Sequence, residues 1–586
     1  MSNIICRVLL LLVVLPSPAL AQNKLKRPNV LFLFTDDQRA DTIAALGNMH
    51  IKTPNLDKLV ARGTAFRRAY CMGAMQGAVC VPSRAMVLSG RTLFKINDNL
   101  KGIPTWPEMF ARMGYRTFMT GKWHNQPASV LAAFSTGKNI FFGGMGDPYT
   151  LPVADITPKR TLTEKKLSGK HSCELFADSA IEFIKEQKGA DKPFVAYVAF
   201  NGPHDPRKAP KEYHALYDKN PPPVPANFLP LHPFNSGDLT VRDEKLAPWP
   251  RTPDVVRQHL ADYYAYITFV DAQVGRILDA LRDAGLEDDT IIVFASDSGL
   301  AVGSHGLFGK QSVYDHSMRA PMIFAGPGVP KGKTSDAFCY LLDIFPTVGG
   351  LAGVAGPQGS EGKNLVPVMK GDVKEVRDSI FLAYRHFQRS VREDRFKIIV
   401  YPHINKTVLF DLENDSHEIK DLARDPAHAK TIERLTTKLK DWQMKLGDKQ
   451  PLRSEKPQPM EFDFSKVPAD KKKASLPSPL RGRGAGGEGD GVPRIRLKDN
   501  DQGTMNNDVM VRYLDSILLI PRCFDRISTR LLETASPSPP TPLPRTGEGS
   551  QFSDQPMAST GERHFLSSRG CLRNHCMTTI MPSACS

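Results

Sequence analysis

The sequence predicts an α/β protein with a mostly parallel main sheet between helices, followed by a smaller antiparallel sheet. Two observations carry this prediction. Over the first 377 residues, apolar segments of strand length alternate with helix-like segments, as in a parallel sheet buried on both faces. From about Asp378 the strand-like segments follow one another without intervening helices, which indicates antiparallel pairing. We therefore expect two folded parts, 28–377 and 378–450.

Four apolar segments are the predicted strands of the first part, and each ends in polar or glycine-containing sequence. Ligands of parallel sheets gather beyond the carboxyl ends of the strands, so residues at these ends are candidates for a site. The predicted strands are 28–36, 193–204, 290–299 and 321–328. Helical periodicity predicts helices at 56–62, 106–113, 173–185 and 255–284.

The second part contains four strand-like segments and a closing amphipathic helix, 429–446. After residue 450 the composition turns to Pro, Ser, Lys and Gly, so we expect a disordered low-complexity tail over 451–586. For one choice of codons, the complementary DNA strand of residues 477–489 encodes a sequence similar to residues 537–549. The hypothesis is a translated inverted repeat without selected structure, and the alternative is an ordinary disordered extension.

The N-terminus has the pattern of a signal peptide, residues 1–21. Arg7 precedes an apolar run that leads to Ala19-Leu20-Ala21, a small-x-small cleavage site. The run is too short to remain as a membrane span. We expect export to the periplasm or out of the cell, with no stable membrane anchor.

The net charge of +15 suggests an anionic ligand, and the motifs decide which kind. No zinc finger, RNP motif or basic stripe accompanies the charge, and no Lys/Arg run is longer than the three residues 471–473. We therefore expect no nucleic-acid partner. A dispersed positive field suits a small anionic substrate.

The most specific motif reads Cys-Val-Pro-Ser-Arg at residues 80–84 and continues to Arg91 through Leu-Ser-Gly. A cysteine that enters a helix beside Arg84 would have a stabilised thiolate and be exposed, whereas the alternatives are a core thiol or a disulfide with Cys71. The motif resembles the signature of the type I, formylglycine-dependent sulfatases, with Ser89 in place of the usual Thr. The resemblance, over about residues 28–450, implies an alkaline-phosphatase-like fold and a maturation enzyme that oxidises Cys80 to formylglycine (3-oxoalanine), the nucleophile.

Carboxylates at two strand ends predict a metal site. Asp36 and Asp37 follow the first strand, where adjacent carboxylates repel unless a cation lies between them. Oxygen ligands without a Cys/His cluster indicate Ca²⁺, with Mg²⁺ possible. By resemblance Asp297 and the matured Cys80 complete the ligands. The next residue is Ser298 where the family has Asn or His, so we expect a weaker ligand or a water there.

Three further blocks resemble the family's cationic and proton-carrying residues: 121–124 (Gly-Lys-Trp-His), 202–206 (Gly-Pro-His-Asp-Pro) and 309–311 (Gly-Lys-Gln). The transition state of a sulfate ester gathers charge on the leaving oxygen, so an acid is needed there and cations on the other oxygens. By resemblance, the leaving group is served by His204 and Lys310, the sulfate and nucleophile by Lys122 and Arg84, and release of sulfate by His124 as base.

Three other residues are weaker candidates for substrate binding. His305 and Arg319 either contact substrate or order the loop around Lys310, and the resemblance does not decide between these roles. Arg207 lies in the stretch 205–254, which carries no motif that we can interpret, and its charge suits a polyanionic sugar.

The leading hypothesis is an exported, cation-dependent sulfatase that hydrolyses a sulfate monoester, with a sulfated carbohydrate as the expected partner. A phosphate or phosphonate ester hydrolase of the same superfamily is the alternative enzyme. The alternative from another class is a degenerate protein that binds sulfated glycans without turnover, because Ser298 departs from the family's ligand pattern.

Overall fold

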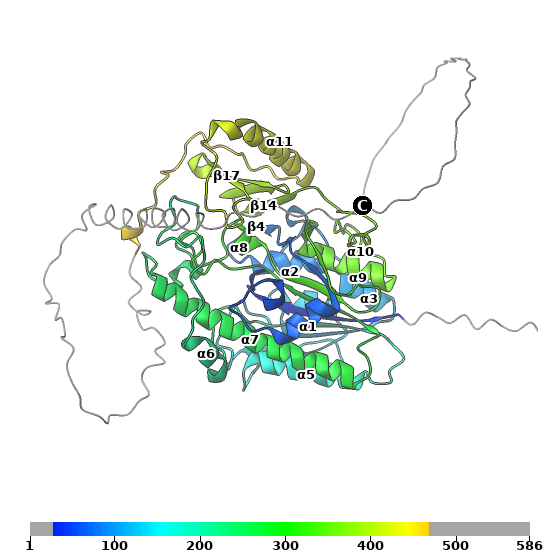
Figure 1. The fold of residues 1–586 in the computed structure, drawn as a ribbon. Coiled ribbons are helices and arrows are strands. Elements are labelled where there is room, and N and C mark those ends of the chain that lie inside the picture. The colour runs from blue at the N-terminus through cyan, green and yellow to red at the C-terminus, as the bar shows by residue number, and fades with distance from the viewer. Residues whose placement is uncertain (1–26, 468–586) are drawn as a thin grey trace, which may run out of the picture. The chain divides into compact units, whose positions relative to one another are not determined.

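The structure is a computed structural model that describes residues 27–467. The predicted signal peptide and the part of the predicted tail after residue 467 lie outside the described residues. Within them, a ten-stranded sheet, a five-stranded sheet, a two-stranded pair of β3 (Ala69–Tyr70) and β13 (Cys339–Tyr340), and the helices packed on them form the folded chain (Figure 1).

The main sheet has ten strands, and its centre is parallel as predicted. Strand β1 lies between β10 and β9, and β9 is followed by β5, all in parallel pairs. The order across the sheet is β12 (Lys333–Ser335), β2 (Gly63–Phe66), β11 (Met322–Ala325), β10 (Thr290–Ser296), β1 (Asn29–Thr35), β9 (Phe194–Ala199), β5 (Arg116–Lys122), β6 (Thr136–Phe141), β7 (Pro152–Ile156) and β8 (Lys166–Leu167).

The predicted strand 321–328 differs from the others because it is antiparallel. Strand β11 pairs antiparallel with both β10 and β2. Between β10 and β11 the chain forms only one short helix, α8 (Asp315–Met318), rather than a crossover helix that would return it to the start of the sheet. The loop between them, residues 297–321, therefore stays at the edge of the sheet where β1 and β10 end.

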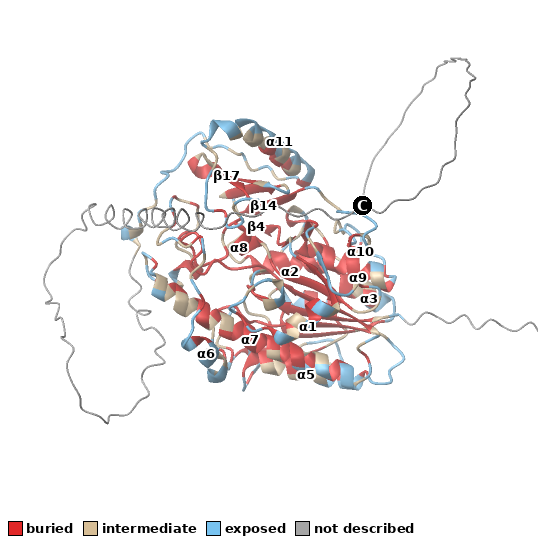
Figure 2. Ribbon diagram, viewed as in Figure 1, coloured by how far each residue is buried: buried red, intermediate tan, exposed pale blue. Residues whose placement is uncertain are grey.

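Two layers of helices bury the main sheet, as the fold prediction requires. On β1, Leu31 and Leu33 pack with the core cluster under α1, α5 and α7, while Phe32 and Phe34 pack with the cluster that includes α2, α3 and α9. Figure 2 shows the buried sides of these helices facing the sheet. The helices are α1 (Pro54–Arg62), α2 (Cys80–Ser89), α3 (Trp106–Arg112), α5 (Ser172–Glu186), α7 (Pro253–Asp283) and α9 (Ile344–Ala352), with shorter α4 (Pro127–Ala133), α6 (Lys211–Asp218) and α10 (Val366–Lys370).

The smaller sheet has five strands in the order β17 (Lys406–Asp411), β16 (Phe396–Tyr401), β15 (Gln388–Arg392), β14 (Ile380–Tyr384) and β4 (Gly73–Ala74). The first four pair antiparallel, which confirms the predicted smaller antiparallel sheet. Helix α11 (Ala429–Leu446) packs against β15 and β16. The edge strand β4 comes from the first part of the chain, seven residues before Cys80, and pairs parallel with β14.

Packed chain continues beyond residue 450, where the predicted tail begins. The backbone of Asn235 donates to the carbonyl of Met460 at 2.7 Å, and the Phe464 ring lies 5.7 Å from that of Trp249. Among residues 27–467, no helix is long and apolar enough to cross a membrane.

Candidate active site

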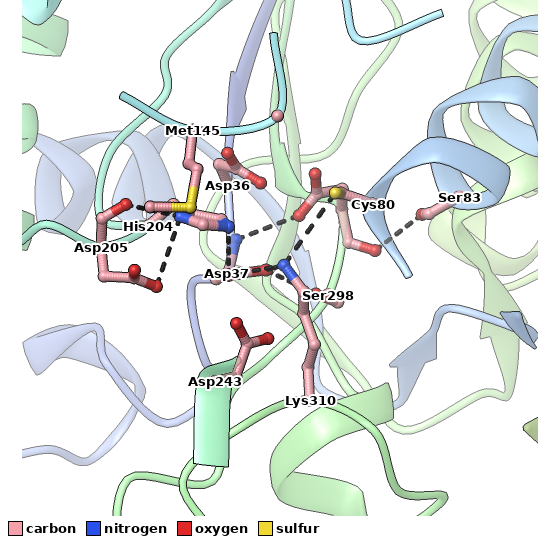
Figure 3. Close-up of polar contacts among 12 residues, drawn as sticks. Asp36, Asp37, Cys80, Ser83, Met145, His204, Asp205, Asp243, Ser298 and Lys310 are labelled. Atoms are coloured by element: carbon pink, nitrogen blue, oxygen red, sulfur yellow. Dashed lines mark hydrogen bonds and ion pairs between the residues drawn. The ribbon is translucent and has the colours of Figure 1, made fainter. Parts of the chain in front are cut away.

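The main sheet brings the predicted site residues together at the carboxyl ends of β1 and β10. Thr35, the last residue of β1, is in register with Ser296, the last residue of β10. Asp36 and Asp37 therefore emerge beside Asp297. Helix α2 begins with Cys80, which lies next to Asp36 and Asp37 (Figure 3).

The Cys80 thiol lies at the centre of this group and is 2% exposed. Its Sγ is 3.2 Å from His124 Nδ1 and 3.9 Å from the Nζ atoms of both Lys122 and Lys310. Burial raises the pKa of the thiol, and the two lysines only partly offset this. The expected exposed thiolate is therefore wrong. The alternative disulfide is also absent, because Cys71 and Cys80 are both free.

Arg84 lies one turn along α2 and turns toward Asp297 rather than toward the thiol. Its Nε and Nη2 atoms lie 3.0 and 2.8 Å from Asp297 Oδ2, and both side chains are fully buried. Burial opposes ionisation of Asp297, but the guanidinium holds the pKa of this carboxyl well below its usual range. The pair is a fixed, buried ion pair beneath Cys80.

Two buried lysines neutralise the two adjacent carboxylates. Lys122, at the end of β5, forms a short ion pair with Asp36 and donates to the Gly144 carbonyl at 2.6 Å. Lys310 donates to Asp37 at 2.6 and 2.7 Å. Burial alone would lower the pKa of Lys310, but the Asp37 carboxylate raises it well above its usual range. Lys310 therefore carries a proton within 3.9 Å of Cys80 Sγ.

The two histidines are neutral. His204 Nδ1 donates to the Asp205 carbonyl at 2.8 Å, which leaves Nε2 facing Asp37 at 3.6 Å. Burial, assisted by the charge of Lys310, lowers the pKa of His204 to about 3. Burial and the nearby Lys122 lower the pKa of His124 to about 2. In this state both rings keep a lone pair that can accept a proton.

The described residues contain one group of acidic and sulfur ligands able to hold a metal ion: Asp36, Cys80 and Asp297, whose ligand atoms lie within 4.8 Å of one another. Asp36 Oδ1 is buried and, within the described residues, has no hydrogen-bond donor, so a coordination position is available. These oxygen donors fit Ca²⁺ or Mg²⁺. Asp37 and Ser298 lie beside the group, where Ser298 Oγ donates to Asp37 Oδ1 at 3.1 Å.

The three weaker candidates contact other groups. The His305 ring stacks on Tyr314 at 4.0 Å, with Nε2 bound to the Glu418 carbonyl at 2.9 Å. Arg319 pairs with Asp315 at 3.7 Å. These contacts suit ordering of the loop that carries Lys310.

Arg207 lies over the Tyr263 ring and contacts His259 Nδ1 at 3.1 Å through one nitrogen. Tyr263 in turn donates to the backbone carbonyl of Asp37 through its hydroxyl. Arg207 is thus two contacts away from the site, and no contact joins it to Cys80 among the described residues.

Four further residues border the site, and of these only Asp205 belongs to a block that resembles the family. Asp205, Arg242 and Asp243 form linked ion pairs next to His204, and Met145 contacts Arg242. Figure 3 shows Asp205 and Met145 beside His204. Arg242 and Asp243 belong to the uninterpreted stretch 205–254, and their sequence contains no pattern that marks them. Asp205 directly follows His204 in the block 202–206, and this position is the only sequence feature that indicates its place in the site.

The sulfatase family model matches residues 28–354, more than half of the chain. The chain belongs to the sulfatase family. A second model, for the C-terminal part of N-sulphoglucosamine sulphohydrolase, matches residues 303–445 of this sulfatase. The family resemblance is confirmed, and with it the prediction of a sulfuric ester hydrolase.

Some of the proteins to which this sulfatase is similar have a carbohydrate in their names. An N-acetylglucosamine-6-O-sulfatase of Bacteroides thetaiotaomicron is 26% identical over 509 residues, covering 73% of this chain and 88% of the relative. A sulfatase of Formosa agariphila is 28% identical over 443 residues, covering 69% of this chain and 83% of the relative. A solved protein in complex with its substrate D-glucosamine-2-N,6-O-disulfate is 25% identical, with a TM-score of 0.61 and coverage of 73% and 100%.

The same fold occurs in a phosphonate monoester hydrolase of Agrobacterium radiobacter, which is 23% identical with a TM-score of 0.58 and coverage of 72% of this chain and 96% of that chain. This likeness concerns the fold alone.

Proposed function

We propose that this sulfatase is an exported enzyme that hydrolyses a sulfate monoester of a carbohydrate, with formylglycine derived from Cys80 and a bound divalent cation. One observation carries the mechanism. Cys80 Sγ lies within 4 Å of two lysines and a histidine, at the group of ligand atoms formed with Asp36 and Asp297. Such a setting combines a nucleophile position, positive charge for a sulfate group and a cation site.

The chain's own residues divide the work by position. Lys122 supplies positive charge beside the nucleophile, and Arg84 serves the nucleophile by holding Asp297 in place through their ion pair. Lys310 holds a proton and His204 lies across Asp37 from it, so this pair is assigned to the leaving oxygen. His124 Nδ1 lies 3.2 Å from Cys80 Sγ, within reach to accept a proton from the residue at position 80.

The proposed formylglycine and the proposed divalent cation would each have one role. When present, the hydrated aldehyde supplies an oxygen nucleophile and the cation supplies positive charge next to it. Asp36, Asp37 and Asp297 would hold the cation, with residue 80 as a further ligand and Ser298 at its edge. The carboxylates are preorganised by backbone contacts, since Asp37 N donates to Asp297 Oδ1 at 3.0 Å.

A paired assay tests the reaction class. We expect 4-nitrophenyl sulfate to be hydrolysed with a higher kcat/KM than 4-nitrophenyl phosphate and phenylphosphonate esters of the same alcohol. A preference for a phosphorus ester would replace the sulfatase proposal by the phosphonate hydrolase alternative. Turnover of none of these esters or of N-acetylglucosamine 6-sulfate, together with binding of sulfated glycans, would favour the degenerate binding protein.

The mass of the peptide that carries Cys80 tests maturation. After production in a host that has a formylglycine-generating enzyme, we expect loss of the sulfur and gain of an aldehyde at residue 80. The peptide with Cys339 serves as the control, because Lys and Arg residues separate it from Cys80 and that buried cysteine should stay a thiol. An unmodified Cys80 in active protein would contradict the proposed nucleophile.

Changing Ser298 to asparagine is expected to tighten cation binding. An amide oxygen reaches further than the serine hydroxyl, which here donates to Asp37 rather than offering a ligand. We expect Ser298→Asn to lower the Ca²⁺ concentration for half-maximal activity roughly tenfold. Ser298→Ala is the control and should change it little. Identical Ca²⁺ requirements for wild type and Ser298→Asn would refute the idea, as would activity that survives removal of all divalent cations.

A further inference from the structure

Gln311 follows Lys310 directly and holds three parts of the site through one side-chain amide. Its Oε1 accepts the backbone N–H of Lys310 at 2.9 Å. Its Nε2 donates to the carbonyl of Gly77 at 3.0 Å and to Asp243 Oδ2 at 2.8 Å. Gly77 lies three residues before Cys80, so the amide joins the lysine, the segment leading to the nucleophile position and Asp243.

From Asp243 the contacts continue to His204. Arg242 pairs with Asp243 through a short contact and with Asp205 Oδ2 at 2.7 Å. Asp205 accepts from His204 Nδ1 through its carbonyl at 2.8 Å, and its Oδ1 lies 3.5 Å from the same nitrogen. The far side of the His204 ring faces Asp37, the carboxylate to which Lys310 is bound.

The contacts therefore form a closed circuit, which we call the Gln311 circuit. It runs through Asp37, Lys310, Gln311, Asp243, Arg242, Asp205 and His204, and back to Asp37. Figure 3 shows Asp243, Lys310, Asp37, His204 and Asp205 around one space. Lys310 and His204 are the two residues assigned to the leaving oxygen. They are also the two neighbours of Asp37 in the circuit.

The surroundings fit the amide closely. A Cβ at residue 309 would lie 2.1 Å from Gln311 Oε1, so only glycine leaves room for the amide oxygen there. Glu244 accepts the N–H of Gly309 at 2.8 Å and thereby fixes the backbone just before Lys310. Gln388, fully buried on β15 of the smaller sheet, donates to the Gln311 carbonyl at 3.3 Å and accepts from Val313 N at 3.0 Å. The side chain and the backbone of Gln311 are thus held independently.

An amide is needed here because it supplies an acceptor and donors at once. A glutamate would turn the contacts with Asp243 and Gly77 into contacts between acceptors and would bring like charge to Asp243. A methionine has a similar length but makes none of these bonds. Either change would release Lys310 from Asp243 and the Cys80 segment while leaving its bond to Asp37.

We propose that Gln311 is a positioning residue that sets Lys310 relative to His204 for protonation of the leaving oxygen. The assignment of these two residues to the leaving oxygen is part of the proposed function, on which this inference rests. Placement of a proton donor matters most when the departing alcohol is strongly basic, and it matters little when the departing phenolate is stable without a proton. The effect should therefore depend on the leaving group.

The test is a series of substituted phenyl sulfates from 4-nitrophenyl to unsubstituted phenyl sulfate. For Gln311→Met and Gln311→Glu we expect kcat/KM to fall by no more than about threefold with 4-nitrophenyl sulfate and by about thirtyfold or more with phenyl sulfate, within the usual contribution of a general acid. Asp243→Asn, which weakens the circuit from its other side, should steepen the dependence in the same direction. In Gln311→Glu/Asp243→Asn a donor again faces an acceptor, so part of the loss with phenyl sulfate should be recovered.

Gln443→Met is the matched control. Gln443 on α11 is buried, whereas Gln311 is half-buried, and it donates to one carboxylate, Asp448, and one carbonyl, that of Gln450, both at 2.8 Å. It is far along the chain from every member of the circuit, so its loss should change stability without changing the leaving-group dependence. The melting temperature and the mass of the Cys80 peptide are measured for each variant to separate folding and maturation from catalysis.

The outcomes separate the two ideas. If wild type cleaves the series and the Gln311 variants lose the same factor for every ester, or lose nothing, the positioning role is wrong while the proposed function stands. If wild type cleaves no sulfate ester or prefers phosphorus esters, the proposed function itself is wrong.

Discussion

Replacement of Cys80 by alanine is expected to abolish sulfate ester hydrolysis. Alanine cannot be converted to an aldehyde and offers no atom that can attack sulfur or complete the ligand group with Asp36 and Asp297. Loss of a nucleophile costs a factor of about 10⁴ or more in kcat, so turnover should fall to background. The measurement is kcat/KM with 4-nitrophenyl sulfate on protein whose fold is verified by its melting temperature.

The matched control for this change is Cys339→Ala. Cys339 is also buried and free, and its thiol contacts only the Arg68 carbonyl, at 3.6 Å, among the contacts described for its sulfur. The control should lose stability, as core cysteines do, but keep kcat within a few fold. Activity of Cys80→Ala above a few per cent of wild type would remove Cys80 from the mechanism.

The second large effect is on stability and comes from Asp297→Asn. Arg84 and Asp297 are fully buried and bonded at 2.8 and 3.0 Å, so neutralising the carboxyl leaves the guanidinium with Asp36 at 3.8 Å as its remaining acidic neighbour. Breaking one side of a buried pair costs about 3–5 kcal/mol. We expect the free energy of unfolding to fall by that amount in urea titrations carried out in EDTA, and cation-dependent activity to disappear.

The comparison for this variant is Asp254→Asn at the start of α7. Asp254 pairs with Arg257 at 2.7 Å, a similar distance, but its side chain is 94% exposed. Solvent screens such pairs, so the free energy of unfolding should change by less than about 1 kcal/mol. Equal effects of the two substitutions would mean that Arg84 is not held by Asp297 as the geometry indicates.

The main strands could be predicted because their sequences are apolar throughout. β1, β9 and β10 are fully buried central strands, and the sequence of each is recognisable without any partner. β5 was not predicted, because Arg116–Lys122 mixes polar and apolar residues and includes a glycine with φ of 95°. A Cβ at Gly121 would lie 1.9 Å from the Ala199 carbonyl oxygen. The need for glycine at this position of β5 therefore comes from the neighbouring strand β9, which the local sequence does not reveal.

The site divides in a similar way. Residues that carry charge or protons, such as Asp36, Lys122 and Lys310, stand in recognisable blocks, and the structure brings them within a few ångströms of Cys80. Their roles stay predictions until the variants are measured. Arg242 and Asp243 could not be found, because their contacts join segments up to 97 residues apart through ordinary ion pairs and hydrogen bonds. No local sequence pattern predicts contacts between segments so far apart in the chain.

The short strand β4 has a consequence for the order of events during synthesis. β4 ends six residues before Cys80, and its partner β14 is made about 300 residues later, which at typical rates of 5–20 residues per second takes about 15–60 s. Until β14 emerges from the ribosome, β4 cannot pair in the smaller sheet. We therefore expect Cys80 to be more exposed during this interval than in the folded protein, where it is 2% exposed. An enzyme that carried out the proposed modification of Cys80 would have this interval to reach the thiol, and truncation before residue 384 should prolong its access.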